Sequence, residues 1–433
     1  MMGRLAGSAV IAVLMTASTA AAAGYDIPIL YSARHIGAGG TAVADVHDSS
    51  AIFHNPSGMG QIGKGNLLID VSLLNGELRS TPYLFGPRSI TSEPVIAPFF
   101  LVGGSGRVHE YVTLGMAVYP VAAASGEYKY QQDGQDVTDK TSLIFMEASP
   151  AIAVNIDKIG LRIGFGYRVT YASLARSRNS PPALGSIPTD VDIKMTGFSF
   201  AGFRAGFQWR FTDYFSIGMN YRSKTKTKID QSGDADRSSG KPSGQGSYWT
   251  KAETEITLPA RISGGFRFDW AQFAFMSDFE WGFNSQNDSL TIHTEPVDAA
   301  IANVFKWRDQ WTWRAGAEYR VYEEKIPLRL GFIYDSRSTN FKYPSGFSTP
   351  PTDTYSVTAG IGYDHGPWEI NVAYARRFGK VLIDDPVNPQ TPSTEDDSLR
   401  QTELLAECPA CGYAGDYKFG INGFYIDFSW DWY

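Results

Sequence analysis

The chain has 433 residues with a formal net charge of −7, and 14% of its residues are aromatic while 19% are charged. This acidic balance, without a run of basic residues, argues against a nucleic-acid partner. A mean hydropathy of −0.20 excludes a bundle of apolar transmembrane helices. Many aromatic residues with moderate charge are instead typical of an outer-membrane β-barrel, which places Trp, Tyr and Phe in two interfacial girdles.

Residues 1–23 have the pattern of a signal peptide. Met1–Arg4 is a short positive region, Leu5–Met15 is apolar, and Ala21–Ala23 supplies the small residues of a cleavage site. The alternative, a retained membrane anchor, is disfavoured because the apolar run is too short to span a bilayer. We therefore expect an exported protein whose mature chain begins near Gly24.

Residues 24–65 are expected to form a plug. The stretch Arg34–Gly60 is rich in glycine, alanine and aspartate, too polar to span a membrane and too short to fold alone. Gly39 and Gly40 permit tight turns, and Asn55-Pro56-Ser57-Gly58 has the composition of a turn. We predict that this segment lies inside a barrel formed by residues 66–433.

Residues 66–433 show repeated runs in which apolar and polar residues alternate. In Leu161–Ser173, bulky side chains alternate with glycine, arginine and threonine, as in a strand with one face toward lipid. Such runs recur about fourteen times, an even number, as a single-chain outer-membrane barrel requires. The predicted fold is an all-β transmembrane, antiparallel outer-membrane β-barrel of about fourteen strands with the plug in its lumen.

The connections alternate between short turns and long polar loops. Gly103–Glu110 is one predicted turn, and Gly126–Lys140 and Arg176–Thr189 are two of the predicted loops. Turns on one side and loops on the other are expected of an outer-membrane barrel, with the turns in the periplasm. A β-sandwich or propeller would not produce this alternation.

Pro120 lies within the third predicted strand, Tyr111–Ser125. It lacks the N–H that a ladder needs, so we expect strand pairing to be interrupted there. Ala122, Ala123 and Ala124 follow and leave little side-chain bulk.

Three segments behind the signal peptide resemble the FadL/TodX family of outer-membrane long-chain fatty-acid and hydrocarbon transporters. Asn55-Pro56-Ser57-Gly58 is similar to the family's Asn-Pro-Ala-Gly motif, and Gly115–Gly126 and Thr257-Leu258-Pro259 are similar to barrel-strand segments. The resemblance implies passive, cofactor-free transport of fatty acids or other hydrophobic molecules across the outer membrane of a Gram-negative cell. It also implies lateral release through a wall gap near the third strand, placed at Pro120 and Ala122–Ala124; a bulge without a gap is the alternative.

The resemblance has further implications for partners and gating. It assigns plug or gating roles to Phe53, Asn55, Pro56, Ser57 and Gly58. It also implies contact with outer-membrane lipid and lipopolysaccharide, and recognition by the barrel-assembly machinery. Two other functions stay open at this point, a plugged channel for polar solutes and a surface adhesin or receptor.

Several cations and aromatic residues are predicted to face the lumen. An arginine can hold a substrate carboxylate with two hydrogen bonds, although such residues also form ion pairs with Asp and Glu across a polar lumen. Phe198 and Phe200 are predicted to contact a substrate chain or to pack on the plug. The cations on the predicted inward faces are Arg162, Arg168, Lys194, Arg204 and Arg329.

No pattern of catalytic or metal-binding residues stands out. His47 and His54 lie near acidic residues but fit no metal-site spacing. Cys408 and Cys411 have redox-motif spacing in the last long loop, where a local disulfide is favoured over catalysis or metal binding in an exported chain. No hydrolase or phosphate-loop motif is present, so the sequence predicts neither an enzyme nor a metal or cofactor site.

Overall fold

The computed structural model describes eleven stretches of the chain, which include most of the residues after 29. They are residues 30–82, 90–93, 95–132, 135–180, 189–231, 239–242, 251–295, 301–304, 306–339, 352–383 and 415–432. The predicted signal peptide and the cysteine pair Cys408 and Cys411 lie outside these residues.

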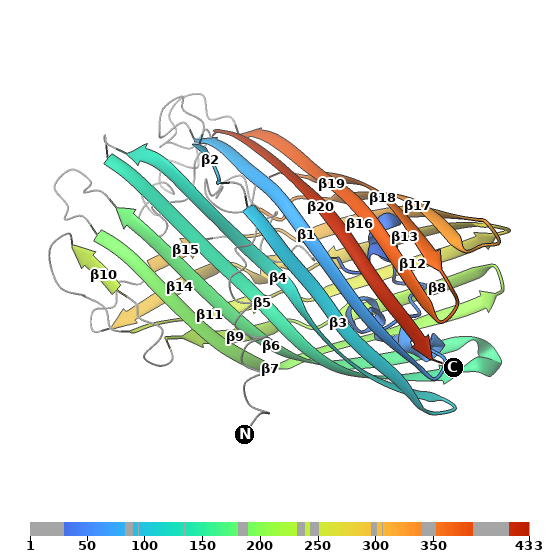
Figure 1. Cartoon of the computed structure of the whole chain (residues 1–433). Coiled ribbons are helices and arrows are strands. Elements are labelled where there is room, and N and C mark those ends of the chain that lie inside the picture. Colours follow the sequence, from blue (N-terminus) through green and yellow to red (C-terminus); the bar gives the residue numbers. More distant parts are fainter. Residues whose placement is uncertain are drawn as a thin grey trace, which may run out of the picture.

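The strands form one antiparallel sheet that closes on itself (Figure 1). Closure is made by the first and last strands, which pair from Gly65–Trp432 to Pro82–Gly415. In chain order the strands are β1 (Gly65–Pro82), β2 (Ile90–Thr91), β3 (Val95–His109), β4 (Val112–Gln132), β5 (Gln135–Ile156), β6 (Leu161–Ser180), β7 (Thr189–Thr212), β8 (Phe215–Arg222), β9 (Thr225–Asp230), β10 (Ser239–Pro242), β11 (Lys251–Leu258), β12 (Arg261–Trp270), β13 (Phe273–Gly282), β14 (Ser289–Glu295), β15 (Ile301–Val304), β16 (Gln310–Val321), β17 (Ile326–Asp335), β18 (Thr354–Asp364), β19 (Trp368–Ile383) and β20 (Gly415–Trp432).

These strands make fourteen crossings of the barrel wall, which confirms the predicted fold. Four crossings are each interrupted once, between β8 and β9, β11 and β12, β13 and β14, and β15 and β16. The short strands β2 and β10 only extend the neighbouring hairpins, by pairing with β1 and β7. An even number of antiparallel crossings brings β1 and β20 together, so the first and last strands cover each other's edges.

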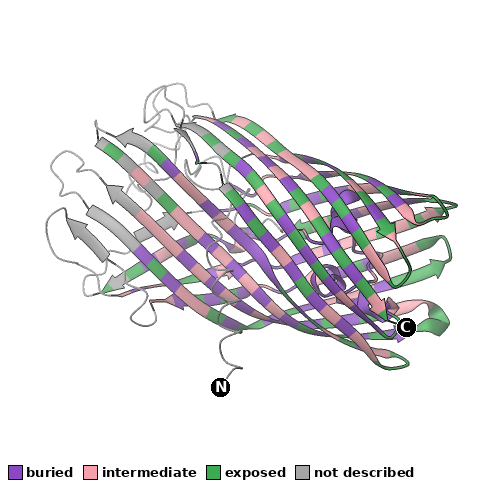
Figure 2. Cartoon of the chain, in the orientation of Figure 1, coloured by how far each residue is buried: buried purple, intermediate pink, exposed green. Residues whose placement is uncertain are grey.

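The predicted alternation of side chains is visible along the wall (Figure 2). In β1, Ile69, Val71 and Leu73 are exposed on the outer face, whereas Asp70 and Ser72 are buried on the inner face. Successive residues of a strand point to opposite faces, so an apolar exterior surrounds a lumen that accepts polar groups. The exposed apolar side chains are the surface that lipid covers.

The predicted connections named above all include strand residues; β6, for example, runs to Ser180, inside the predicted loop Arg176–Thr189. β3 continues to His109, so the turn lies at Glu110 and Tyr111 and not across Gly103–Glu110. The predicted loop Gly126–Lys140 is mostly strand, because β4 runs to Gln132 and β5 begins at Gln135. These strand ends carry polar residues on both faces, so they lack the alternation by which a half-buried strand is recognised.

Residues 30–62 lie within the barrel, toward the end where short turns join the strands (Figure 1). This plug segment contains helix α2 (Ala33–Gly37), helix α3 (Ala51–His54) and the 3₁₀-helix η1 (Pro56–Gln61). Helix α2 packs against β17–β20, and η1 packs against β4–β7 on the other side of the lumen. None of the helices in the described ranges is long and apolar enough to cross a membrane.

Candidate functional site

The side chain of Asn55 makes hydrogen bonds both within the plug and to the barrel wall. Its side-chain amide donates to the carbonyl oxygens of Val43 at 2.8 Å, Phe207 at 3.0 Å and Met219 at 3.3 Å. Its side-chain oxygen accepts from the backbone N–H of Ser57 at 3.3 Å and from the hydroxyl of Ser57 at 2.7 Å. Pro56 begins η1, where a missing N–H has no effect on the helix. The Asn-Pro-Ser-Gly turn therefore holds the plug against the wall through the hydrogen bonds of Asn55.

Substituting Asn55 should loosen the plug. Asn55→Ala removes the donor to one buried and two partly buried carbonyls, and we expect the local opening free energy of the plug to fall by about 2–4 kcal/mol. Asn55→Asp should do more damage, because a carboxylate repels the same carbonyls that the amide binds. Hydrogen exchange of plug amides in the refolded protein measures both effects. Equal protection in Asn55→Asp and the wild type would contradict this role.

Two wall carboxylates bind backbone N–H groups of the plug. Asp278 of β13 accepts from Ala42 at 2.8 Å and Val43 at 3.1 Å. Asp427 of β20 accepts from the Ser32 hydroxyl at 2.7 Å and from the Arg34 backbone N–H at 3.1 Å. Neither residue was predicted from the sequence. Both lie on the inward face of strands whose outer face is apolar. A carboxylate buried there requires hydrogen-bond donors, and this could have indicated that they bind the plug.

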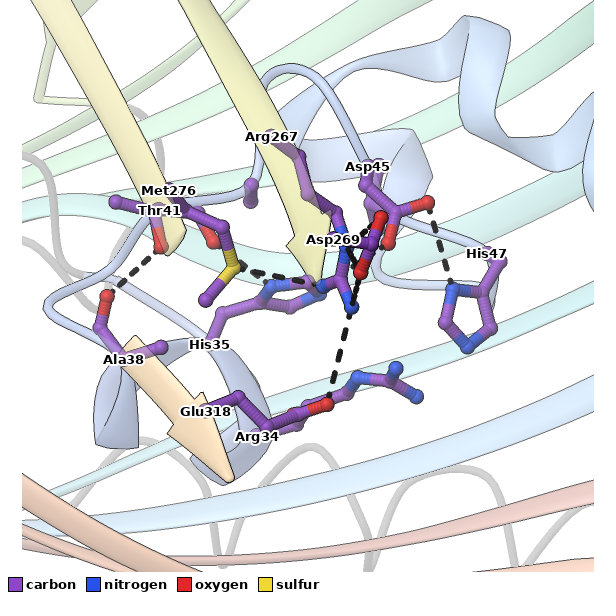
Figure 3. Close-up of polar contacts among 12 residues, drawn as sticks. Arg34, His35, Ala38, Thr41, Asp45, His47, Arg267, Asp269, Met276 and Glu318 are labelled. Atoms are coloured by element: carbon purple, nitrogen blue, oxygen red, sulfur yellow. Dashed lines mark hydrogen bonds and ion pairs between the residues drawn. The ribbon is translucent and has the colours of Figure 1, made fainter. Parts of the chain in front are cut away.

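Ion pairs join the plug to the wall on the side near the turns (Figure 3). Arg267 of β12 lies 3.3 Å from Asp45 of the plug and 3.8 Å from Glu318 of β16. Arg34 of the plug lies 3.0 Å from Glu369 of β19. These pairs are largely buried, so removal of one partner leaves the other charge in a poorly solvated position.

Two histidines of the plug pack together, with ring centroids 5.1 Å apart. Burial, assisted by the neighbouring Arg34, lowers the pKa of His35 to about 3. Burial and the neighbouring His35 lower the pKa of His54 to about 3 as well. Both rings are therefore neutral at pH 7. Among the described residues, no group of three or more His, Cys, Asp or Glu side chains could hold a metal ion.

Arg168 is in the lumen as predicted, but it is committed to an ion pair. Its guanidinium donates to Glu147 of β5 from Nε at 2.8 Å and also from Nη2, and to the carbonyl of Ser223 at 2.8 Å. Glu147 and Arg168 are both fully buried. Of the two roles considered for lumen arginines, pairing with a carboxylate describes this one, although Glu147 lies on the neighbouring strand β5 and not across the lumen.

The other predicted lumen cations differ in their surroundings. Arg329 is paired with Glu318 at 2.6 Å, and Arg162 packs its methylene groups near Gly60. Lys194 is exposed, so its predicted inward placement is wrong. Arg204 is buried and lies 5.0 Å above the ring of Phe53, while its Nε has no hydrogen-bond partner in the described part of the chain.

Arg204 borders a small cavity of about 50 Å³ between plug and wall. The plug contributes Phe53 and His54 among other residues, and the wall contributes several charged side chains. An excess of cations over carboxylates gives this cavity a positive character. Its charged lining residues are Arg204, Arg222, Arg261, Arg314, Asp278 and Glu280.

Phe198 and Phe200 face outward, so their predicted contact with substrate or plug is wrong. Their side chains are 61% and 63% exposed on the outer surface. Phe200 and Ala201 of β7 together stand opposite Val169 of β6, which is a β-bulge. One extra residue reverses the phase of a strand. Strict alternation would place Phe198, Phe200 and Arg204 on the same face. Because Arg204 lies beyond the bulge, it faces inward while the two phenylalanines face outward.

The ladder between β3 and β4 is incomplete near Pro120. In the described residues it ends at the Val102–Val118 pair, although β3 continues to pair with β1 and β4 with β5. β4 bulges between Pro120 and Ala122, as expected from the missing N–H. The chain before β3 contacts β4 where the Glu93 N–H donates to the Glu127 carbonyl at 2.8 Å. Among the described residues, a stretch of wall without β3–β4 ladder pairing thus lies beside Pro120.

In the described residues, most of the buried apolar side chains that line the lumen lie on one side of it. From β5 to β14, the half of the wall nearer the long loops has buried apolar side chains pointing inward. The corresponding part of β16–β18 is more polar, with Thr312, Asp335 and Thr354 buried beside a single apolar Ile333 among the described residues. The apolar lining belongs to the same cluster as Phe53 and the strand residues beside Pro120. Its members are Leu143, Phe145, Leu174, Ile193, Met195, Ile229, Ile256, Leu258, Leu290 and Ile292.

The closed wall, the exposed apolar belt and the internal plug define an outer-membrane β-barrel protein. A family model described as outer membrane protein transport protein (OMPP1/FadL/TodX) matches residues 13–402. The chain belongs to this family, and is therefore a transport protein of the outer membrane and not an enzyme. A search of curated proteins gives no match.

Solved structures share the whole fold at low sequence identity. A Pseudomonas aeruginosa FadL homologue has a TM-score of 0.75 at 16% identity, covering 94% of this chain and 99% of its own. The Pseudomonas putida toluene transporter TodX has a TM-score of 0.68 at 13% identity, with 96% and 100% covered. The Ralstonia pickettii toluene transporter TbuX has a TM-score of 0.63 at 16% identity, with 92% and 97% covered.

Proposed function

We propose that this protein carries hydrophobic small molecules passively across the outer membrane and releases them sideways into the bilayer between β3 and β4. The observation that carries the proposal is the apolar lining on one side of the lumen, which runs to the residues beside Pro120. A channel for water-soluble solutes has a polar interior. Toluene transporters among the related structures support the same substrate class.

The energetics favour lateral release over release into water. Each buried methylene contributes roughly 0.8 kcal/mol, so a sixteen-carbon chain prefers hydrocarbon to water by roughly 12 kcal/mol. Transfer into the periplasm would be strongly uphill, whereas transfer from an apolar lumen into lipid is close to neutral. A wall interruption beside small residues supplies a route that needs no energy source.

The proposed substrates include both fatty acids and neutral hydrocarbons. The positive cavity beside Arg204 favours an acid. A carboxylate could bind Arg204 there while its chain lies on Phe53 and the apolar lining. A neutral hydrocarbon would use only the apolar surface. Uptake of labelled oleate and labelled toluene, by a strain lacking its own transporter, separates the two. Contacts with lipopolysaccharide and the barrel-assembly machinery stay predictions.

Filling the wall interruption should stop transport. Ala123 is buried beside Pro120, and Ala123→Trp places a large ring where the two strands separate. We expect uptake of hydrophobic substrate to fall at least tenfold in cells, with the folded barrel still present in the membrane. Ala148→Trp is the control, because Ala148 lies on the adjacent strand β5, opposite Val118 and on its outer face.

The same strains distinguish the two other functions. Unchanged hydrophobe uptake in Ala123→Trp would remove lateral release at this place from the proposal. No uptake of either hydrophobe by the wild type, together with a large ion conductance, would favour a channel for polar solutes. Adhesion mediated by the loops, without either activity, would favour a surface receptor.

A further inference from the structure

Tyr31 stands directly against the wall interruption. It is fully buried, and its hydroxyl donates a hydrogen bond to the carbonyl of Pro120. Pro120 lies just past Val118, where the β3–β4 ladder ends. The phenol of a plug residue therefore binds a strand carbonyl at the place where the neighbouring strand has separated.

The ring of Tyr31 also separates the wall interruption from the lumen cavity. The centroid of the Tyr31 ring lies 5.0 Å from that of Phe53, which it meets edge-on, and 6.1 Å from that of Tyr119. Phe53 in turn packs edge-on against Tyr119, with a centroid distance of 5.1 Å. Phe53 borders the cavity beside Arg204. Three rings thus fill the space between the cavity and Pro120, and only Tyr119 belongs to the wall.

The backbone beside Tyr31 is strained and is held by several contacts. Ser32 has φ of 64° and ψ of 115°, a conformation with positive φ that a residue with a side chain seldom adopts. The Ser32 hydroxyl donates to Asp427, and the carbonyl of Tyr31 lies 3.0 Å from Nε2 of His54. Strain of this kind persists only where the surroundings enforce it.

We infer that Tyr31 is a gating residue, which closes the lumen side of the opening between β3 and β4 and must move for a hydrophobic molecule to leave. The inference rests on the proposed function and adds a specific moving part to it. The phenol suits this role because its ring fills an apolar gap and its hydroxyl satisfies the Pro120 carbonyl while the gate is closed. An entering apolar chain replaces the ring contacts as the Tyr31 side chain withdraws.

A reversible bridge tests whether Tyr31 must move. In a background with Cys408→Ser and Cys411→Ser, Tyr31→Cys and Ala122→Cys are joined by a short reducible bis-thiosulfonate linker. We expect the bridge to form, oleate and toluene uptake to fall at least tenfold, and a reducing agent to restore it. Tyr31→Cys alone, treated identically, controls for modification of a single thiol.

The outcomes of the bridge experiment separate the gate from transport itself. Wild-type uptake through the bridged protein would overturn the gate and leave the proposed function standing. Failure to bridge two thiols that each react with a maleimide would also overturn it, because the predicted proximity would be absent. No uptake by the unmodified wild type would defeat the proposed function, and the gate with it.

A single hydroxyl provides a finer test. Tyr31→Phe keeps the ring but removes the hydrogen bond to Pro120, so we expect uptake to rise about threefold to tenfold, as loss of one hydrogen bond allows. Tyr119→Phe is the matched control, because Tyr119 belongs to the same group of three rings but it is the Tyr31 hydroxyl that binds the Pro120 carbonyl. Equal uptake by Tyr31→Phe and Tyr119→Phe would contradict a closing role for the Tyr31–Pro120 bond.

Discussion

Glu147→Gln is expected to destabilise the barrel by about 3–5 kcal/mol. Glu147 is fully buried, accepts two hydrogen bonds from Arg168 and lies 3.9 Å from Arg204. Glutamine keeps the shape but removes the negative charge, so two buried guanidinium groups lose their counterion. Urea unfolding of the refolded protein in lipid vesicles, followed by tryptophan fluorescence, measures the loss.

An exposed carboxylate of the same wall supplies the control for Glu147→Gln. Glu255 pairs with Lys226 at 2.5 Å, but both side chains are about half exposed. Glu255→Gln should therefore change the free energy of unfolding by less than about 1 kcal/mol. Similar urea midpoints for the two variants would mean that water reaches the Glu147 pair and screens it.

Gly164→Ala is expected to displace the plug and raise ion conductance severalfold. Gly164 of β6 faces the start of η1, and a Cβ there would lie 2.1 Å from the backbone nitrogen of Ser57 and 2.2 Å from the carbonyl carbon of Pro56. Both contacts are with backbone, which cannot rotate away as a side chain can. Overpacking of this kind typically destabilises by 1–3 kcal/mol, and here it acts on the docking of the plug. Conductance in planar bilayers measures the result.

Gly166 gives a matched control two residues further along β6, on the same inner face. A Cβ at Gly166 would lie 3.6 Å from the nearest heavy atom, an ordinary van der Waals distance. Gly166→Ala should therefore retain wild-type conductance. If Gly164→Ala also retained it, the plug would not seal against this part of the wall.

The number of wall crossings, the outward faces of most strands and the interruption at Pro120 follow from local sequence patterns. Alternation along one strand reports which side chains meet lipid, as Ile69, Val71 and Leu73 demonstrate. Proline lacks an N–H wherever it stands, so a disturbed ladder at Pro120 needs no knowledge of its neighbours. These features each depend on a single residue type or on one strand.

Features that depend on how neighbouring strands pair could not be predicted from local sequence patterns. The bulge at Phe200 and Ala201 exists only relative to Val169 of the next strand, and that one extra residue turned Phe198 and Phe200 toward lipid. Glu147 was unseen as the partner of Arg168 because cross-strand register brings them together. Asp278, Asp427 and Tyr31 acquire their roles through contacts between plug and wall, which form only when the barrel closes around residues far apart in the chain.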